Sequence, residues 1–323
     1  MLDACGRNIN YVRISITDRC NLRCVYCMPE GGVNSFEHSE ILSYEEIIHL
    51  VKLLSKLGIR HIRITGGEPM ARKGCLDFID SVHAIEGIES ISMTTNALLL
   101  HGCVDKAYKA GLRALNISMD TLDPAIYKAM TRGGDVSKVL SVIDDALALG
   151  MQVKINAVPV RGMNDQGLCG LAALARDRDV CVRFIELMPV GCGANLTPIP
   201  TDEVREMMVR AFGDCAQDDK KHGFGPAKYI HPEGFKGSIG FISPISHEFC
   251  SECNRVRITA DGYLKLCLNH TAGADLRAML RGGASDEELL DVLHSAILRK
   301  PTRHGFEENI SDREVRRMNE IGG

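Results

Sequence analysis

Short runs rich in β-branched residues alternate with helical segments through the first 187 residues of the chain. Six runs are predicted to be strands: Tyr11–Ile16, Arg60–Thr65, Ser90–Thr94, Leu112–Ser118, Met151–Val158 and Val180–Leu187. After the first of them, Ser43 and Glu46 form a capping box that opens an amphipathic helix ending at Gly58. Strands alternating with helices at this spacing indicate βαβ units and a parallel sheet. A closed barrel of this type has about eight strands, so six predict an incomplete (βα)6 TIM-like barrel with an open side.

Residues that could form a functional site lie where these predicted strands end. In βα barrels the reactive groups lie on loops at the C-terminal ends of the strands. The ends and last turns of strands two to six carry Gly66-Gly67-Glu68-Pro69, Thr94-Thr95-Asn96, Ser118 with Asp120, Lys154 with Asn156, and Glu186 with Met188. Each residue alone could be a turn or cap residue, but their shared position predicts one functional rim.

The loop after the first strand contains Cys20, Cys24 and Cys27, spaced CxxxCxxC. Thiolates are ligands for zinc, copper(I) or iron–sulfur clusters. Structural zinc sites are closed by four ligands, and a 4Fe–4S cluster is typically held by four cysteines. Three cysteines without a histidine therefore predict a cluster with one open iron. The alternative is a set of reduced structural thiols or half of a zinc knuckle.

The alternation stops near Gly191, where glycine and proline become frequent. We expect an α+β extension with short strands and helices at Gly237–Ile242, Val256–Ile258, Tyr263–Leu266, Asp275–Leu280 and Asp286–Leu298. Gly262 fits the DG turn of a hairpin between the second and third of these segments. The predicted division is a barrel domain of residues 1–225 and an extension of residues 226–323 that closes the open side of the barrel.

A second cysteine set in the extension, Cys250, Cys253 and Cys267, has the spacing CxxCx₁₃C. It again supplies three thiolates, so it fits a second open cluster. Zinc completed by His247 or His270 is the other interpretation, and spacing alone favours zinc. Arg255 and Arg257 follow directly, and on a strand they point to the same face. Two guanidinium groups on one face suit a carboxylate or a phosphate.

Composition narrows the class of protein. The 323 residues carry a net charge of −4, which argues against a general nucleic-acid surface. The chain shows neither an apolar signal-peptide core nor a run long enough to span a membrane. The 13 cysteines are then expected to be thiols or metal ligands rather than disulfides. We therefore expect a cytoplasmic protein that binds neither membrane nor nucleic acid.

The cysteine loop is also where the chain becomes similar to a known family. CxxxCxxC with an aromatic residue before the last cysteine, here Tyr26, is the signature of the radical S-adenosylmethionine (SAM) superfamily. Over nearly its whole length the chain resembles the GTP 3′,8-cyclase family of molybdenum cofactor biosynthesis. The matching segments are RISITDRCNLRCVYCMP, IRITGGEP, MTTN, LNISMD, VKINAV, FIELMPVG, CSECNRVRITADG and the terminal IGG.

The resemblance implies two 4Fe–4S clusters, a bound SAM and a GTP substrate. It assigns Cys20, Cys24 and Cys27 to the SAM cluster, and Cys250, Cys253 and Cys267 to the second cluster. It places Tyr26, Gly67, Ser118 and Met188 at SAM-binding positions. It places Arg13, Arg63, Thr94, Lys154, Arg255 and Arg257 at GTP-binding positions, with Thr95 as the alternative to Thr94. It also implies that the terminal Gly322 and Gly323 reach into the barrel and are needed for the reaction.

The activity implied is conversion of GTP into 3′,8-cyclo-7,8-dihydro-GTP through a 5′-deoxyadenosyl radical. An electron donor of flavodoxin or ferredoxin type and a homodimer are implied as partners. The alternative is another radical SAM enzyme with an auxiliary cluster, such as a peptide maturase, and the third hypothesis is a zinc protein. One departure from the family pattern is Ala97, which follows TTN where the family usually has glycine. If this turn needs a positive φ, the alanine is strained.

Overall fold

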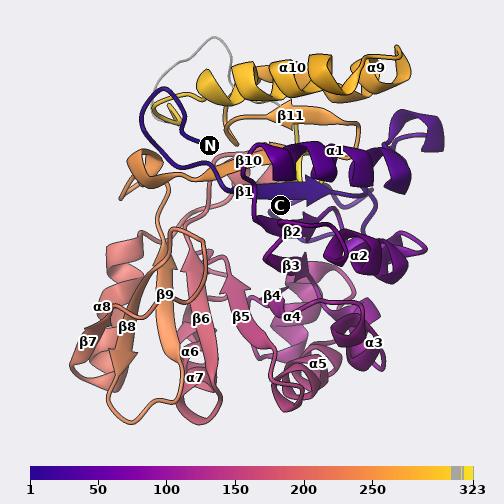
Figure 1. Cartoon of the computed structure of the whole chain (residues 1–323). Helices are drawn as coiled ribbons and strands as arrows, with labels where there is room; N and C mark the ends of the chain where they lie inside the picture. The colour runs from indigo at the N-terminus through magenta and orange to yellow at the C-terminus, as the bar shows by residue number, and fades with distance from the viewer. Residues whose placement is uncertain (307–313, 315, 323) are drawn as a thin grey trace.

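The computed structural model describes residues 1–306, 314 and 316–322. Within these residues a single twelve-stranded sheet runs through the molecule in the order β12-β11-β10-β1-β2-β3-β4-β5-β6-β9-β8-β7. Figure 1 shows the sheet as a curved wall, with helices α1 to α5 along the side of β1 to β5. The sheet is an open arc, because β12 and β7 form its two ends. The predicted incomplete barrel is thereby confirmed.

Six parallel strands form the centre of this arc: β1 (Tyr11–Ser15), β2 (His61–Thr65), β3 (Ser90–Thr95), β4 (Ala114–Ser118), β5 (Gln152–Ala157) and β6 (Val180–Ile185). The remaining strands are β7 (Cys215–Asp218), β8 (Lys228–Pro232), β9 (Ser238–Ile242), β10 (Arg255–Ile258), β11 (Tyr263–Lys265) and β12 (Gly273–Asp275). Each of the six central strands overlaps the segment that the sequence predicted.

The α-helices are α1 (Tyr44–Lys56), α2 (Cys75–His83), α3 (Val104–Lys109), α4 (Pro124–Thr131), α5 (Val136–Ala148), α6 (Leu168–Ala172), α7 (Leu174–Asp177), α8 (Thr201–Phe212), α9 (Leu276–Arg281), α10 (Asp286–Leu298) and α11 (Met318–Ile321). Four of them, α2, α4, α8 and α11, were not expected from the sequence. Among the described residues, none of the helices has both the length and the apolar character that a membrane crossing requires.

The segments that follow β6 add strands to both edges of the central six. Strand β9 pairs in parallel with β6, and β8 and β7 follow it antiparallel. Strand β10 pairs in parallel with β1, and β11 and β12 follow it antiparallel. The expected hairpin is confirmed, with Gly262 at φ +83° in its turn. Its first strand is also the neighbour of the first barrel strand, so the two halves of the chain share one sheet.

The core lies between the sheet and the helices outside it. Val12 and Ile14 on β1 are buried on the helix side, whereas Arg13 between them faces the inside of the arc. Helix α1 begins at the predicted capping box, in which Ser43 accepts a hydrogen bond from the Glu46 backbone. Apolar residues of α1 such as Leu50 are fully buried against the sheet. The inside of the arc is thus left to polar and charged side chains.

Ala97 occupies the turn after β3 with φ +66°, in the left-handed region. A residue with a Cβ pays about 1–2 kcal/mol for this conformation. Its backbone N–H donates to Thr95 Oγ1 at 2.9 Å, and its methyl group is fully buried, so the turn is held from both sides. The strain predicted for this departure from the family pattern is therefore present.

Arg7 connects the start of the chain to the extension. Its guanidinium is buried and pairs with Asp3 at 2.6 Å. It also donates to the carbonyls of Cys250, Lys300 and Pro301 at 2.9, 3.1 and 2.9 Å. Burial by itself would raise the pKa of Asp3, but hydrogen bonds from Arg7 lower it below its usual value. One side chain thus fixes two segments that lie more than 240 residues away in the sequence.

We expect Arg7→Ala to lower the free energy of unfolding by about 3–5 kcal/mol, because it leaves the buried Asp3 carboxylate without its partner. Arg210→Ala is the matched control, since Arg210 forms an i,i+4 pair of the same kind with Glu206, at 3.7 Å, on the exposed surface. Such exposed pairs contribute about 0–1 kcal/mol. Urea unfolding of the two variants measures the difference, and equal losses would contradict a special role for Arg7.

Candidate active site

The first three cysteines lie on one loop between β1 and η1 (His38–Glu40). Burial raises the pKa of Cys20 to about 11, and burial with the charges of Cys20 and Cys192 raises that of Cys27 to about 12. The pKa of the Cys24 thiol is also raised, by burial and by the charges of Asp120, Cys27 and Cys20. The three thiols therefore share one enclosed space, in which the thiolate forms need a positive partner.

The glycines of the GGEP segment are required by the close approach of this loop. A Cβ on Gly67 would lie 2.4 Å from the Arg19 carbonyl oxygen and 2.6 Å from that of Asp18. A Cβ on Gly66 would lie 2.7 Å from the Thr17 carbonyl oxygen. Backbone N–H groups then join the segments, Gly67 to Thr17 at 2.7 Å and Glu68 to Arg19 at 2.8 Å. The loop after β2 thus packs directly against the backbone of the cysteine loop.

Two buried carboxyl groups support the same loop; the sequence placed both on the predicted rim but gave them no individual role. Glu68 accepts hydrogen bonds from Thr95 Oγ1 at 2.7 Å and the Asn96 N–H at 2.8 Å, and burial raises its pKa to about 7. Asp120 accepts the Tyr26 hydroxyl at 2.8 Å, and burial raises its pKa to about 6. The Tyr26–Asp120 bond joins the cysteine loop to the end of β4.

The other predicted SAM-binding residues lie around this loop. Ser118 ends β4, in register with Asn156 on β5. Met188 follows β6, and a Cβ on Gly193 would lie 2.8 Å from the Met188 carbonyl and 3.7 Å from that of Tyr26. Tyr26, Gly67, Ser118 and Met188 therefore belong to loops or strand ends on one rim of the arc, as the sequence predicted.

Positive side chains form a row across the inside of the arc. Arg257 on β10, Arg13 on β1 and Arg63 on β2 are directly in register on three adjacent strands. Burial and the charges of Arg257 and Arg63 lower the pKa of Arg13 well below its usual value. Burial, together with the charge of Arg255, lowers the pKa of Arg257 to about 10. So many like charges in one place favour an anionic ligand.

Lys154 and Thr94 lie further along the same inner face, aligned through Asn116. Burial, together with the charges of Arg183 and Arg63, lowers the pKa of Lys154 to about 7. Thr94 Oγ1 is buried and has no hydrogen-bond partner among the residues that the structure describes, whereas Thr95 bonds to Glu68. Of the two threonines, Thr94 is thus the one with an unused hydroxyl on the cation side.

Arg183 is a further charged residue on this face, and it was missed from the sequence. It is buried, and it donates to Asn116 Oδ1 at 2.7 Å and to Asn156 Oδ1 at 2.6 Å. A cavity of about 500 Å³ is lined by Arg183, Lys154 and the connection between β7 and β8. The sequence did contain an indication of Arg183, because it is the one charged residue in the otherwise apolar run VCVRFI.

The second cysteine set lies where the extension meets β1. Cys250 begins the 3-10 turn η6 (Cys250–Glu252), Cys253 ends it, and Cys267 follows β11. Burial by itself would raise the pKa of Cys253, but the charges of Arg255 and Lys300 lower it to about 6. The buried Lys300 ammonium donates to the Leu266 carbonyl at 2.5 Å, next to Cys267. Cations therefore lie beside Cys253, whereas burial and the charges of Cys267, Cys253 and Glu248 raise the pKa of Cys250.

The histidines near this set have other partners. His247 Nε2 lies 3.1 Å from Asp202 Oδ1, and His270 Nε2 lies 3.0 Å from the Arg303 carbonyl. His304, with Glu248, lies close enough to Cys250 for a shared metal ion. Its Nε2 donates to the Pro244 carbonyl and its Nδ1 accepts the Phe306 N–H. Both ring nitrogens of His304 are therefore already used.

The C-terminal segment runs between the two cysteine sets. The Asn319 backbone N–H donates to the Cys27 thiol, and Arg257 Nη1 donates to the Gly322 carbonyl at 2.8 Å. Arg257 in turn interacts with the thiolates of Cys253 and Cys267. Both sets therefore border the same short stretch of chain. Gly323 lies outside the described residues.

Two family models match the chain in succession. The first describes the radical SAM superfamily and matches residues 14–175, and the second describes Molybdenum Cofactor Synthesis C and matches residues 180–306. The GTP 3′,8-cyclases of Syntrophomonas wolfei and Desulforamulus reducens are 44% and 45% identical to it over 327 aligned positions, covering 100% of each chain. The chain belongs to the GTP 3′,8-cyclase family.

Fold similarity is consistent with this family. The crystal structure of Streptococcus suis SuiB bound to S-adenosylmethionine matches 94% of this chain and 68% of SuiB, with a TM-score of 0.61. The sequence identity is only 14%, so the match with SuiB concerns the fold alone. As a radical SAM protein, this GTP 3′,8-cyclase family member takes SAM and a 4Fe–4S cluster. Three soft thiol ligands in one enclosed space fit such a cluster.

We expect Gly67→Ala to reduce the iron and sulfide retained per chain after anaerobic reconstitution, because its methyl group would displace the Arg19 carbonyl and the cysteine loop with it. Overpacking of this kind costs about 1–3 kcal/mol of stability. Gly170→Ala is the control, since a Cβ there meets nothing within 4 Å. Iron and sulfide analysis checks the prediction, and unchanged iron in the Gly67 variant would contradict it.

Proposed function

We propose that this chain converts GTP into 3′,8-cyclo-7,8-dihydro-GTP in molybdenum cofactor biosynthesis. The reaction joins carbon 3′ of the ribose to carbon 8 of the guanine. The observation that carries the proposal beyond family membership is the row of cations in register on the inner face of the arc. A triphosphate is the anion that such a row fits, whereas a peptide substrate would leave its charges uncompensated.

The first half of the proposed site handles SAM. Cys20, Cys24 and Cys27 hold the 4Fe–4S cluster, and Tyr26, Gly67, Ser118 and Met188 surround SAM. Bound together, the cluster and SAM supply a 5′-deoxyadenosyl radical. The chain itself orients the loop: Gly67 permits the close approach to Arg19, and Asp120 fixes the Tyr26 ring through its hydroxyl.

The second half of the site holds GTP. Arg13, Arg63, Lys154, Arg255 and Arg257 bind the triphosphate and orient the nucleotide, with Thr94 as a hydroxyl ligand. The unused Thr94 hydroxyl and the crowding of like charges support this assignment. Like charges in low dielectric repel one another strongly, so a bound anion stabilises the whole row. Binding energy from the triphosphate thereby positions the ribose for reaction.

A second 4Fe–4S cluster completes the proposal: Cys250, Cys253 and Cys267 would hold it and would leave one iron without a protein ligand, available to the substrate. The lowered pKa of Cys253 supports a ligand that is a thiolate at neutral pH. Zinc is the alternative that spacing favoured. It needs a fourth ligand, and His247, His270 and His304 are engaged elsewhere through the nitrogens described above. We therefore favour the cluster.

Further parts of the proposal concern organisation. We propose the division into residues 1–225 and 226–323, a flavodoxin- or ferredoxin-type electron donor, and a homodimer. None of the 13 cysteines, all of which the structure describes, is in a disulfide, and this agrees with the proposed cytoplasmic location. Gly322 contributes to the site through the Arg257 bond, and a Cβ there would lie 2.7 Å from Ser15 Cβ. A residue larger than glycine would therefore not fit position 322.

Anaerobic reconstitution with iron, sulfide and SAM tests the function. We expect about eight irons per chain, as two four-iron clusters require. We also expect 5′-deoxyadenosine to form with GTP and not with ATP, together with the cyclised nucleotide. Cys24→Ala serves as the control that removes the first cluster. One zinc per chain without sulfide, or 5′-deoxyadenosine that forms equally without GTP, would contradict the proposal.

The pH dependence of GTP affinity tests Lys154. In the free protein Lys154 loses its proton as the pH rises through about 7, whereas a bound triphosphate favours the protonated amine. GTP binding must then take up a proton above pH 7, so affinity falls as the pH rises, by up to about tenfold per unit. Calorimetry from pH 7.0 to 8.5 measures this fall.

Lys154→Arg is the matched control for this measurement, because an arginine stays charged throughout the range. Its affinity should change with pH only as far as GTP itself titrates. If the natural chain and the arginine variant show the same pH profile, Lys154 does not titrate against GTP.

A further inference from the structure

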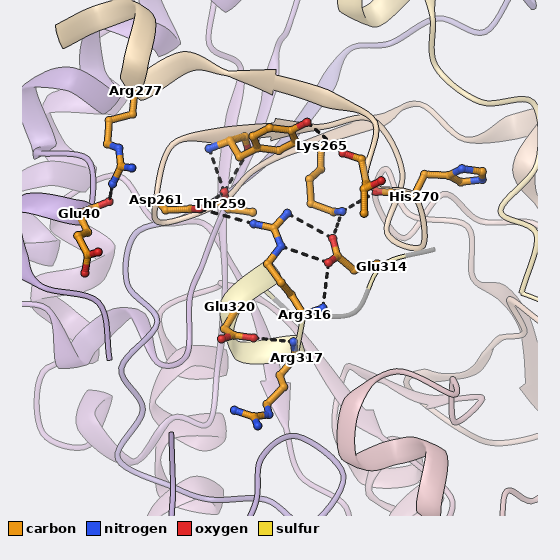
Figure 2. Close-up of polar contacts among 12 residues, drawn as sticks. Glu40, Thr259, Asp261, Lys265, His270, Arg277, Glu314, Arg316, Arg317 and Glu320 are labelled. Carbon is orange, nitrogen blue, oxygen red and sulfur yellow. Dashed lines mark hydrogen bonds and ion pairs between the residues drawn. The ribbon is translucent and has the colours of Figure 1, made fainter. Parts of the chain in front are cut away.

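A buried ion pair holds the C-terminal segment to β11, whose Lys265 is in register with Arg257 on β10. Lys265 ends β11 and is completely buried, and its ammonium donates to a Glu314 carboxylate oxygen (Figure 2). It also donates to the His270 carbonyl at 2.6 Å. The Glu314 backbone N–H is bonded to the Asn269 carbonyl at 2.6 Å. Both the side chain and the backbone of Glu314 are thus fixed to β11 and to the connection between β11 and β12.

Arg316 extends this network toward the site. Its backbone N–H and its Nε both donate to Glu314 Oε1, at 2.9 and 3.2 Å. Its Nη1 lies 3.6 Å from Asp261 Oδ2, in the turn between β10 and β11. Figure 2 shows Arg316 lying between these two carboxylates. Burial alone would raise the pKa of Glu314, but hydrogen bonds from Arg316 and Lys265 lower it, so the carboxylate is charged.

From this network the chain passes directly into the site. The Arg317 N–H donates to Glu320 at 2.7 Å and caps α11. Asn319 is buried, and its backbone contacts the Cys27 thiol. Three residues later the Gly322 carbonyl accepts the hydrogen bond from Arg257. Only seven residues, 315–321, therefore lie between Glu314 of the ion pair and Gly322.

A chain end is disordered by default unless something ties it down, because each ordered residue loses backbone entropy. Between Glu314 and Gly322 this loss accumulates over the whole segment. One hydrogen bond from Arg257 offsets only a small part of it. The buried Lys265–Glu314 pair fixes the start of the segment, whereas Ile321 packs with Val190 and Phe306 near its end. Removing one partner of such a buried pair costs about 3–5 kcal/mol.

We propose that the Lys265–Glu314 ion pair is the anchor of the C-terminal tail and makes Lys265 a positioning residue for cyclisation. It acts through the tail, by placing Gly322 against Arg257 and Asn319 against Cys27. The inference rests on the proposed function, since it concerns how the tail of a cyclase is held. It predicts that loss of the anchor releases residues 316–322 while both cysteine sets keep their iron.

The variants are chosen to separate anchoring from stability. Lys265→Met alone leaves a buried carboxylate without its lysine, so the chain loses stability for that reason. The double variant Lys265→Met/Glu314→Met removes both charges and leaves Arg316 its partner Asp261. Lys109→Met is the control, since Lys109 pairs with Asp105 on the exposed surface. A chain lacking Gly322 and Gly323 shows the effect of a missing tail end.

Two quantities are measured on the reconstituted holoenzyme under anaerobic conditions. The first is hydrogen exchange of the backbone amides of residues 316–322, and the second is the cyclised product formed per 5′-deoxyadenosine. In the double variant we expect exchange at least tenfold faster and a product ratio at least fivefold lower, near that of the shortened chain. Iron per chain should be unchanged. Lys265→Arg should recover most of both quantities.

Unchanged exchange in the double variant would overturn the anchor. Faster exchange with an unchanged product ratio would overturn the positioning role of Lys265. The failure of the proposed function has a different signature: the natural chain itself would then form no cyclised product from GTP. In that case the double variant would still show faster hydrogen exchange of residues 316–322 than the natural chain.

Discussion

The parallel pairing of β10 with β1 is the constraint on which the site depends. It places a strand from near residue 256 beside the first strand of the barrel, in the register that aligns Arg257 with Arg13 and Arg63. A shift by one residue would turn Arg257 to the helix side and bring Val256 inside. The same pairing carries the second cysteine set to the barrel, because Cys253 lies two residues before β10.

The cation row follows from this pairing, and it makes the chain depend on its ligand. Three guanidinium groups on neighbouring strands, with Lys154 further along, repel one another in a buried space. The fold tolerates this because the apolar core lies on the other face of the sheet, behind residues such as Val12 and Ile14. A triphosphate relieves the repulsion, so the feature that weakens the free protein is the one that binds the substrate.

The sequence predicted the elements better than their partners. Runs rich in β-branched residues located β1 to β6, but the pattern RVRI does not say that β10 pairs with β1. Helix α8 was missed although Val204 and Met208 are four residues apart, because the glycine- and proline-rich stretch before it predicted a loop. The Tyr26–Asp120 hydrogen bond joins residues 94 positions apart. Nothing in the sequence around Lys265 distinguishes it from a surface lysine, although it is fully buried. Contacts of this kind depend on tertiary packing, which local patterns do not contain.

An iron-edge anomalous difference map from anaerobic crystals of the reconstituted chain with SAM and GTP tests the central claim most directly. The account predicts two four-iron peaks, one at Cys20, Cys24 and Cys27 and one at Cys250, Cys253 and Cys267. Nucleotide density should lie between them, against Arg13 and Arg257. A single iron peak, zinc at the second set, or a nucleotide bound outside the arc would contradict it.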